Sequence, residues 1–320
     1  MAKLIDTLLL LALPASGKSE VRRYLSTLTL AQCRDEFHIG PTVQLDDFPY
    51  VHLMRRIDEE LADLGQAQIF FHRTDRPFKD PVEWGTLIQL LNEDYTDLQK
   101  RTRLDPPSAA KHIFSRLEKA RRAVGGPAKL SNLNDTILEK LSEALERESK
   151  ELLDSRLAEY PDTLEGKTIV IEFARGGPQG AQMPLKPPLG YEYSLSQLSD
   201  EILSRSAILY VWVTPEESRR KNVARTDPND PGSILHHGVP HEVMIKDYGC
   251  DDIEYLLKKS GQAGTITISA HKKTYHLPVG RFDNREDKTT FVRDPQDSWD
   301  SKDVRALHDG LKRAFEQLAK

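Results

Sequence analysis

Cysteine is nearly absent from this chain of 320 residues, which contains two, Cys33 and Cys250. They lie far apart, and neither belongs to a CxxC pair or to a regular Cys/His spacing. The sequence therefore encodes neither a disulfide framework nor a zinc site. Free thiols suit a reducing compartment, and we expect a cytoplasmic protein.

Long hydrophobic runs and an excess of positive charge are missing as well. No segment approaches the roughly 18 uninterrupted apolar residues of a membrane-spanning helix, so no membrane attachment is expected. The chain has 45 Lys+Arg against 50 Asp+Glu, a formal net charge of −5, which excludes a protein that coats nucleic acid. With 38% hydrophobic residues, 18 Gly and 19 Pro, the chain is neither low-complexity nor collagen-like, and we expect one elaborated globular domain.

The N-terminal residues allow two interpretations. Lys3, the apolar run at 8–13 and the small residues that follow are similar to a short secretory signal peptide. Asp6 inside the apolar stretch and the single basic residue before it argue against a signal peptide. The other interpretation is a strand over 4–13, because a short run that is apolar throughout is typical of a buried strand in a parallel sheet.

Strand and helix patterns alternate over much of the chain, which predicts crossover connections and a parallel sheet. Further strands are expected at 42–45, 168–174, 207–213, 264–270 and 274–282, the last two as a strand pair. Between them, residues 49–166 are highly charged, with apolar residues at three- and four-residue spacing, and predict a helical insertion or cap. We therefore expect a core domain made of residues 1–48 and 167–320. The expected helices are at 19–30, 51–64, 82–98, 109–124, 132–160 and 301–319.

Residues 12–19 have the spacing of a Walker A phosphate-binding loop between a strand and a helix, with Ala12 where the first glycine normally stands. A Cβ at position 12 is costly at positive φ and harmless at negative φ. Gly17 lets the backbone approach phosphate, Lys18 reaches the β and γ oxygens, and the Ser19 hydroxyl can coordinate Mg²⁺. The alternative is an ordinary strand-to-helix turn. The residues expected to contact the nucleotide here are Ala12, Pro14, Ala15, Ser16, Gly17, Lys18 and Ser19.

Two further segments extend this pattern. The sequence Leu-Asp-Asp-Phe-Pro-Tyr at 45–50 resembles the Asp-Asp-Phe-Tyr element of P-loop nucleoside and nucleotide kinases, in the uridine kinase, nicotinamide riboside kinase and pantothenate kinase group. Pro-Phe-Lys-Asp-Pro-Val-Glu-Trp at 77–84 is similar to that group's Asp-His-Pro-Asp-Ala-Phe-Asp stretch. The resemblance covers the first 30 residues, 45–95 and, more loosely, 167–290. It implies an α/β fold: a three-layer αβα P-loop domain with a parallel five-stranded sheet of nucleotide-kinase type, here with a large helical insertion.

Asp46 and Asp47 end the second predicted strand. Ligands bind beyond the carboxyl ends of strands in open α/β sheets, so an aspartate here can accept a proton from an acceptor hydroxyl, help to hold Mg²⁺, or do both. The alternative is that both cap the next helix. Two adjacent carboxylates point in different directions, so at most one is the base. The resemblance assigns that role to Asp46, and we expect Asp47 and Tyr50 on the acceptor side.

Glu172 and Arg175 lie at the end of the strand predicted at 168–174. Glu172 takes the place of a Walker B acid, which holds Mg²⁺ usually through water. Arg175 can reach an anionic acceptor or the transferred phosphoryl group. The two residues could instead form a surface ion pair.

The helix after the strand at 207–213 contains several arginines. In the kinases that the chain resembles, this helix carries arginines into a lid, here about 215–260, over the donor phosphates. The resemblance makes Arg219 catalytic and places Arg225 on the nucleotide, with a solvated helix face as the alternative. The lid tip is expected at 226–240, where His236, His237 and His241 lack the carboxylate or cysteine framework of a metal site. Asn284, after the last strand, resembles the segment that contacts adenine, or belongs to a plain turn.

The sequence predicts an ATP- and Mg²⁺-dependent kinase that transfers the γ-phosphoryl group to a hydroxyl of a small nucleoside-, vitamin- or sugar-like metabolite. One alternative is a 5′-hydroxyl polynucleotide kinase, although its basic groove is not favoured by the acidic net charge, and nucleic acid is not an expected partner. Another is a non-catalytic ATP-binding switch or scaffold. The apolar stripe of 132–160 is compatible with a homodimer or with packing on its own domain.

Overall fold

The computed structural model describes residues 4–225 and 238–318. In this part of the chain six strands form one mixed sheet in the order β2-β3-β1-β4-β6-β5. The five strands from β2 to β6 are parallel to their neighbours, and β5 is antiparallel to β6. The strands are β1 (Thr7–Leu11), β2 (Thr42–Asp46), β3 (Thr168–Phe173), β4 (Ser206–Trp212), β5 (Thr265–Ala270) and β6 (Lys273–Asp283).

The expected α/β fold is confirmed, and the sheet differs from the expected parallel sheet of five strands, because the described residues include a sixth strand, β5, that is antiparallel. A two-residue turn, His271-Lys272, joins β5 to β6, and both residues have positive φ, 51° and 60°. This backbone matches the twist of a tight hairpin, which forces β5 to run antiparallel. The predicted strand pair is therefore confirmed, and it adds a sixth strand at the edge of the sheet.

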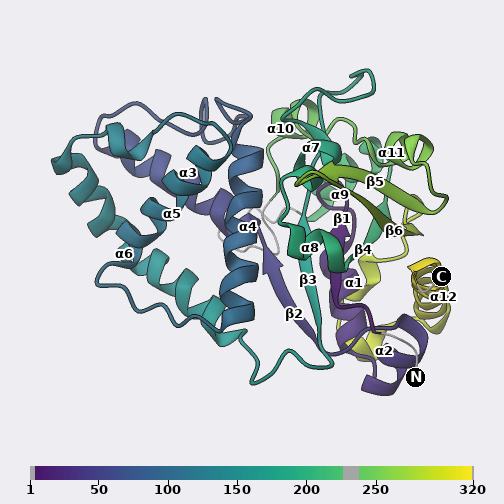
Figure 1. Ribbon diagram of the computed structural model, residues 1–320. Coiled ribbons are helices and arrows are strands. Elements are labelled where there is room, and N and C mark those ends of the chain that lie inside the picture. Colours follow the sequence, from purple (N-terminus) through teal and green to yellow (C-terminus); the bar gives the residue numbers. More distant parts are fainter. Residues whose placement is uncertain (1–3, 226–237, 319–320) are drawn as a thin grey trace.

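Helices cover both faces of the sheet (Figure 1). The side chains of β1 alternate between two cores: Leu8 and Leu10 pack in one, Leu9 and Leu11 in the other. Both cores are closed by helices, so β1 is buried at every residue. The described residues form the helices α1 (Lys18–Ser26), α2 (Leu30–Phe37), α3 (Phe48–Asp63), α4 (Glu83–Lys100), α5 (Ala109–Ala123), α6 (Asp135–Ala158), α7 (Gly190–Ser196), α8 (Asp200–Arg205), α9 (Pro215–Arg225), α10 (His241–Lys246), α11 (Ile253–Lys259) and α12 (Ser301–Leu318).

The predicted helix at 19–30 ends earlier than expected, and a second helix that the sequence does not predict follows it. α1 ends at Ser26, and α2 begins after Thr29, whose side chain accepts a hydrogen bond from the backbone N–H of Gln32 while the Gln32 side chain accepts one from the backbone of Thr29. This reciprocal capping box starts a new helix and explains the break.

The insertion forms a third core of its own from α3, α4, α5 and α6, which gather beside the sheet (Figure 1). α4 belongs to two cores. Leu87 and Leu90 pack in the insertion, whereas Ile88 and Leu91 pack with the sheet. The apolar stripe of α6 also packs inward, through residues such as Leu141 and Leu145. The insertion is thus joined to the sheet along α4 rather than through a linker.

The chain leaves β1 toward β2 on one side and later crosses from β3 over β1 to β4. The direction of strand addition therefore reverses at β1, and the carboxyl ends of the strands at such a point border a ligand-binding crevice. The 12–19 loop, Asp46, Glu172 and α9 all lie at this edge, because each follows or ends one of these strands. None of the helices in residues 4–225 and 238–318 has the length and hydropathy needed to span a bilayer.

Candidate active site

The 12–19 loop has the backbone of a tight cradle. Gly17 has φ 104°, and a Cβ built there would lie 2.5 Å from Thr289 Oγ1. Ala15 also has a positive φ, 54°, which for a residue with a Cβ is strained. Ala12 is fully buried and is not among the residues with positive φ, so its Cβ causes no backbone strain. The missing first glycine is therefore compatible with the loop conformation.

Three buried side chains hold the carbonyl groups of this loop. Tyr191 Oη donates to Ala12 O (3.0 Å), Ser218 Oγ to Pro14 O (2.7 Å) and Asn284 Nδ2 to Ser16 O (2.7 Å). Asn284 is fully buried and supports the loop from behind, whereas the sequence predicts it at the adenine. The loop is thus fixed by carbonyl contacts that leave its N–H groups available for an anion.

Ser16 carries a polar atom that has no partner in the protein. Its side chain is 1% exposed, its Oγ makes no hydrogen bond in the described part of the chain, and the residue lines the central pocket. A buried hydroxyl without a partner is costly, and a phosphate oxygen would satisfy it. Ser16 therefore fits the anion-binding role that the sequence predicts.

Lys18 and Glu172 face each other beside the loop. Lys18 Nζ lies 3.8 Å from Glu172 Oε1, and Arg22 Nη1 lies 2.7 Å from Glu172 Oε2. Burial lowers the pKa of Lys18, and the charges of Glu172 and Asp46 oppose this shift. The ammonium group is thus held next to the loop by carboxylates, as a group that reaches phosphate oxygens requires.

Asp46 lies next to Glu172, its register partner on the adjacent strand. Burial is the main cause that raises the pKa of Asp46 to about 8, followed by repulsion from Glu172 and Asp47. Asp46 Oδ1 accepts the N–H of Phe48 at 2.8 Å, so the predicted alternative of helix capping is part of its role. No cation lies within 4.0 Å of its carboxylate in residues 4–225 and 238–318.

Asp47 is used differently. Its Oδ2 lies 2.7 Å from Arg175 Nη1, and both side chains are buried. Arg175 gives its remaining donors to Ser194 Oγ and to the carbonyls of Ala174 and Trp84. Arg175 therefore fastens β3 to α3 and α4, and few of its donors are left for the acceptor anion that the sequence predicts for it.

The oxygen ligands near the 12–19 loop fit a magnesium ion. Ser19 is exposed at the pocket, and Asp46 and Glu172 bring two mutually repelling carboxylates to the same edge. Mg²⁺ prefers such oxygens, with substrate phosphates and water completing its shell. In the described ranges no three His, Cys, Asp or Glu residues form a metal site by themselves. A magnesium ion bound here would therefore need further ligands, such as water or an anionic ligand.

α9 directs one predicted arginine to the pocket and another away from it. Arg225 lines the central pocket with the 12–19 loop, and its Nε is buried without a partner in the described residues. Arg219 lies a turn and a half earlier, pairs with Glu216 at 3.0 Å and borders a separate surface hollow. Arg225, but not Arg219, therefore lines the same pocket as the 12–19 loop.

α9 is anchored by a buried lysine. Lys221 Nζ lies 2.7 Å from Asp287 Oδ1 and 3.3 Å from Thr289 Oγ1, the atom that closes over Gly17. The helix that carries Arg225 is thus tied to the back of the loop. The predicted lid tip with His236 and His237 lies outside the described residues, and His241 begins α10 as an exposed residue.

The central pocket continues from the loop into a second compartment with aromatic walls. This compartment is lined by aromatic and charged side chains from α3, from the segment before α4 and from the segment around α10. Phe71 stacks on Phe78 at 4.5 Å, and Trp84 packs edge-on against Phe78 and Tyr248. We call these four side chains the aromatic wall. Tyr50, predicted on the acceptor side, lies outside the pocket and donates to Asp94 at 2.8 Å.

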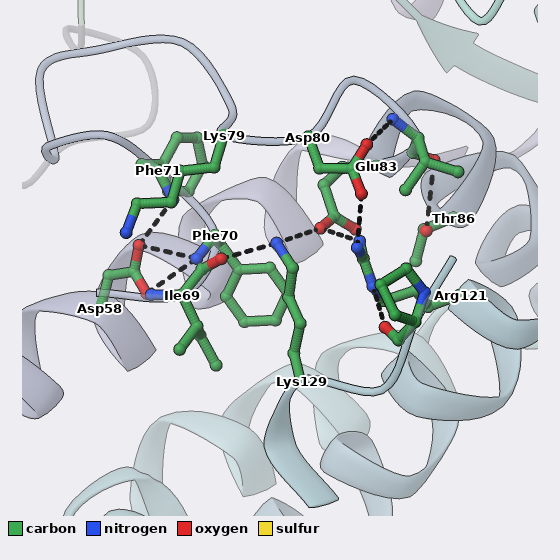
Figure 2. Close-up of polar contacts among 12 residues, drawn as sticks. Asp58, Ile69, Phe70, Phe71, Lys79, Asp80, Glu83, Thr86, Arg121 and Lys129 are labelled. Atoms are coloured by element: carbon green, nitrogen blue, oxygen red, sulfur yellow. Dashed lines mark hydrogen bonds and ion pairs between the residues drawn. The ribbon is translucent and has the colours of Figure 1, made fainter. Parts of the chain in front are cut away.

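A buried polar network supports the aromatic wall from behind (Figure 2). Asp58 accepts the backbone N–H groups of residues 69–71 through both carboxylate oxygens. Arg121 contacts Glu83 and lies 2.6 Å from Asp80, while Lys129 Nζ lies 2.8 Å from Glu83 and donates to the carbonyl of Ile69. These contacts fix the loop over 69–84 that carries three of the four aromatic side chains.

Three charged residues of the second compartment are missing from the sequence prediction, Arg55, Arg76 and Asp247. Arg55 lies on α3 two turns after Phe48, and both line the pocket, as residues at helical spacing on one face do. That spacing after Asp46-Asp47 is a signal that could have identified Arg55. Asp247 follows the short helix α10 and has no such pattern.

Comparisons with known proteins identified no relative: no protein-family model, no curated protein and no solved structure matches this chain. Function is therefore inferred from the geometry of the chain itself.

Proposed function

We propose that the protein is an ATP- and Mg²⁺-dependent kinase that transfers the γ-phosphoryl group to a hydroxyl of a small molecule. The observation that carries this proposal is one pocket lined both by the 12–19 loop and by Asp46, a carboxylate without a cationic partner in the described residues. Beyond Asp46 the same pocket continues along an apolar wall that suits part of a second substrate.

The loop side suits the donor nucleotide. Gly17 and the N-terminus of α1 present backbone N–H groups, and Ser16 adds a buried hydroxyl without a partner. Lys18 and Arg225 bring two positive charges to the transferred group. Mg²⁺, held by Ser19, Glu172 and the phosphates, supplies further charge neutralisation at the phosphate oxygens.

Asp46 suits the role of general base. In the transfer its carboxylate takes the proton of the acceptor hydroxyl, the hydroxyl oxygen forms a bond to the γ-phosphorus, and the bond from that phosphorus to the β-phosphate oxygen breaks, which releases ADP. A pKa raised to about 8 lies near the operating pH, where a base works best. Asp47 is less suited, because Arg175 occupies its carboxylate.

The test is ADP release from ATP and Mg²⁺ with a panel of nucleosides, vitamins, sugars, hydroxylated amino acids and a 5′-hydroxyl oligonucleotide. We expect one class of small acceptors to accelerate ADP release, with a loss of about 100-fold or more in Lys18→Ala and Asp46→Asn. Lys302→Ala and Asp63→Asn, at exposed positions, are the matched controls and should retain the wild-type rate.

Three outcomes contradict the proposal in different ways. Failure of the wild type to bind ATP removes the role of the 12–19 loop. Acceleration by the oligonucleotide alone makes the protein a polynucleotide kinase. ATP binding with no acceleration by any acceptor, together with an unchanged slow rate in Asp46→Asn, favours the switch or scaffold alternative.

A further inference from the structure

The second compartment contains an arginine without a carboxylate partner. Arg175 pairs with Asp47 and Arg76 with Glu242, whereas Arg55 has no carboxylate oxygen within 4.0 Å in the described part of the chain. Its guanidinium lies 4.2 Å from the ring centroid of Phe71 and donates to the carbonyl of Thr74. Nε and Nη2 of Arg55 donate no hydrogen bond within the described residues, so these donors are available to a ligand.

The same compartment contains a carboxylate without a partner. Asp247 lines the pocket, and its carboxylate accepts no hydrogen bond and forms no ion pair within residues 4–225 and 238–318. Burial raises its pKa to about 7, and the charge of Arg55 acts against this shift from too far away for an ion pair. Asp247 and Arg55 thus influence each other without neutralising each other.

Two half-buried opposite charges that remain apart are costly in the empty protein. A ligand with one group of each sign would satisfy both. A guanidinium edge matches a carboxylate through two parallel hydrogen bonds, and an ammonium group is favoured both by a carboxylate and by aromatic faces. The aromatic wall lines the same pocket as the two charged groups, which favours a ligand with an apolar part.

We infer that the acceptor is amino acid-like: a hydroxyl reaches Asp46, an apolar middle part contacts the aromatic wall, a carboxylate pairs with Arg55 and an ammonium group pairs with Asp247. This inference rests on the proposed kinase function for its hydroxyl, but the recognition of the two charged ends can be tested without turnover.

The experiment uses hydroxylated L-amino acids of increasing length (serine, homoserine, 5-hydroxynorvaline and tyrosine), each also as its methyl ester and its N-acetyl derivative. Binding is measured as a shift in melting temperature of the Lys18→Ala protein, and kcat/KM is measured for the wild type. We expect at least one unmodified amino acid to bind, and each blocked derivative to bind about 10- to 100-fold more weakly, the loss expected for one charged hydrogen-bonding group.

Two variants test which residue binds the carboxylate of the ligand and which binds its ammonium group. Arg55→Met should weaken binding of the unmodified amino acid about 10-fold or more and leave binding of the methyl ester unchanged. Asp247→Asn should weaken binding of the unmodified amino acid to a similar extent and leave binding of the N-acetyl derivative unchanged. Arg73→Met and Asp63→Asn are the exposed controls. A purely structural role of either residue would weaken parent and derivative alike, so this crossed pattern separates recognition from folding.

The inference is overturned if blocked and unmodified compounds bind equally, if no amino acid in the panel binds, or if a neutral nucleoside or sugar is the acceptor and neither variant changes its kcat/KM. Specific binding with the crossed pattern but no ADP release supports the recognition site while contradicting the kinase. ADP release that a neutral acceptor accelerates and no amino acid changes supports the kinase function while contradicting the amino acid recognition site.

Discussion

At the scale of single residues, positions 12 and 17 of the 12–19 loop respond to substitution in opposite ways. Gly17 has a positive φ and a crowded Cβ direction, whereas Ala12 has neither constraint. Gly17→Ala should therefore cost about 2 kcal/mol or more in unfolding free energy and weaken ATP binding about 10-fold or more. Urea unfolding and ATP titration measure both effects.

Ala12→Gly restores the usual first glycine of a phosphate-binding loop. We expect no gain in ATP affinity, because the loop already has the required conformation, and a loss of about 0.5–1 kcal/mol in stability from the greater freedom of glycine in the unfolded chain. A clear gain in affinity would mean that the Cβ of Ala12 obstructs the phosphate.

Asp46 should make stability depend on pH in the protein without nucleotide or Mg²⁺. Its folded pKa is raised to about 8, so the ionised form is disfavoured in the folded state. The protonated Asp46 carboxyl therefore contributes to the free energy of unfolding. This contribution is fully present below the ordinary aspartate pKa of about 3.9 and is lost as pH rises to about 8. Asp46→Asn should gain melting temperature relative to the wild type from pH 5 to 8, with no further gain above. A constant difference at every pH would contradict the raised pKa.

At the scale of elements, α9 determines which arginine lines the pocket of the 12–19 loop. Its carboxyl end points Arg225 into the pocket, while Arg219 faces another hollow. Arg225→Ala should lower kcat/KM for ATP about 10- to 100-fold, since it removes a charge from the developing phosphoryl group. Arg219→Ala should change kcat/KM for ATP by no more than about twofold. The opposite ranking would restore the role that the sequence predicts for Arg219.

The elements that a sequence pattern can identify are those whose signal is local. The buried strand before Ala12, the helices of the insertion and the strand-end position of Asp46 follow from periodicity and motif spacing, and all lie where the sequence predicts them. Asn284 and Arg175 are conspicuous in sequence for their positions after strands, but their donors are used within the protein. Asp247 and Arg55 line the same pocket only through tertiary packing, which no local pattern encodes.

At the scale of the whole molecule, α4 makes the insertion and the sheet interdependent. Leu87 packs in the insertion core and Leu91 in the sheet core, both fully buried. Each change to alanine should cost about 2–5 kcal/mol. Because one helix is part of both cores, we expect a single cooperative unfolding transition in each variant.

Urea unfolding followed by far-UV circular dichroism and by tryptophan fluorescence measures this cooperativity. The two signals should coincide in the wild type and in both variants. Leu30→Ala, at a side chain that is 68% exposed, is the control and should change stability by no more than about 0.5 kcal/mol. Two separate transitions would show that the insertion unfolds independently of the sheet.

One member of the aromatic wall has an optical consequence. Of the three tryptophans at positions 84, 212 and 299, Trp84 alone lines the central pocket. Its indole ring lies 5.0 Å from the guanidinium of Arg175 and packs edge-on against Phe78 and Tyr248. A molecule that binds against the aromatic wall changes the polarity around this ring, so the unlabelled protein contains an intrinsic fluorophore in the central pocket. Phenylalanine in place of Trp212 and Trp299 would isolate its emission.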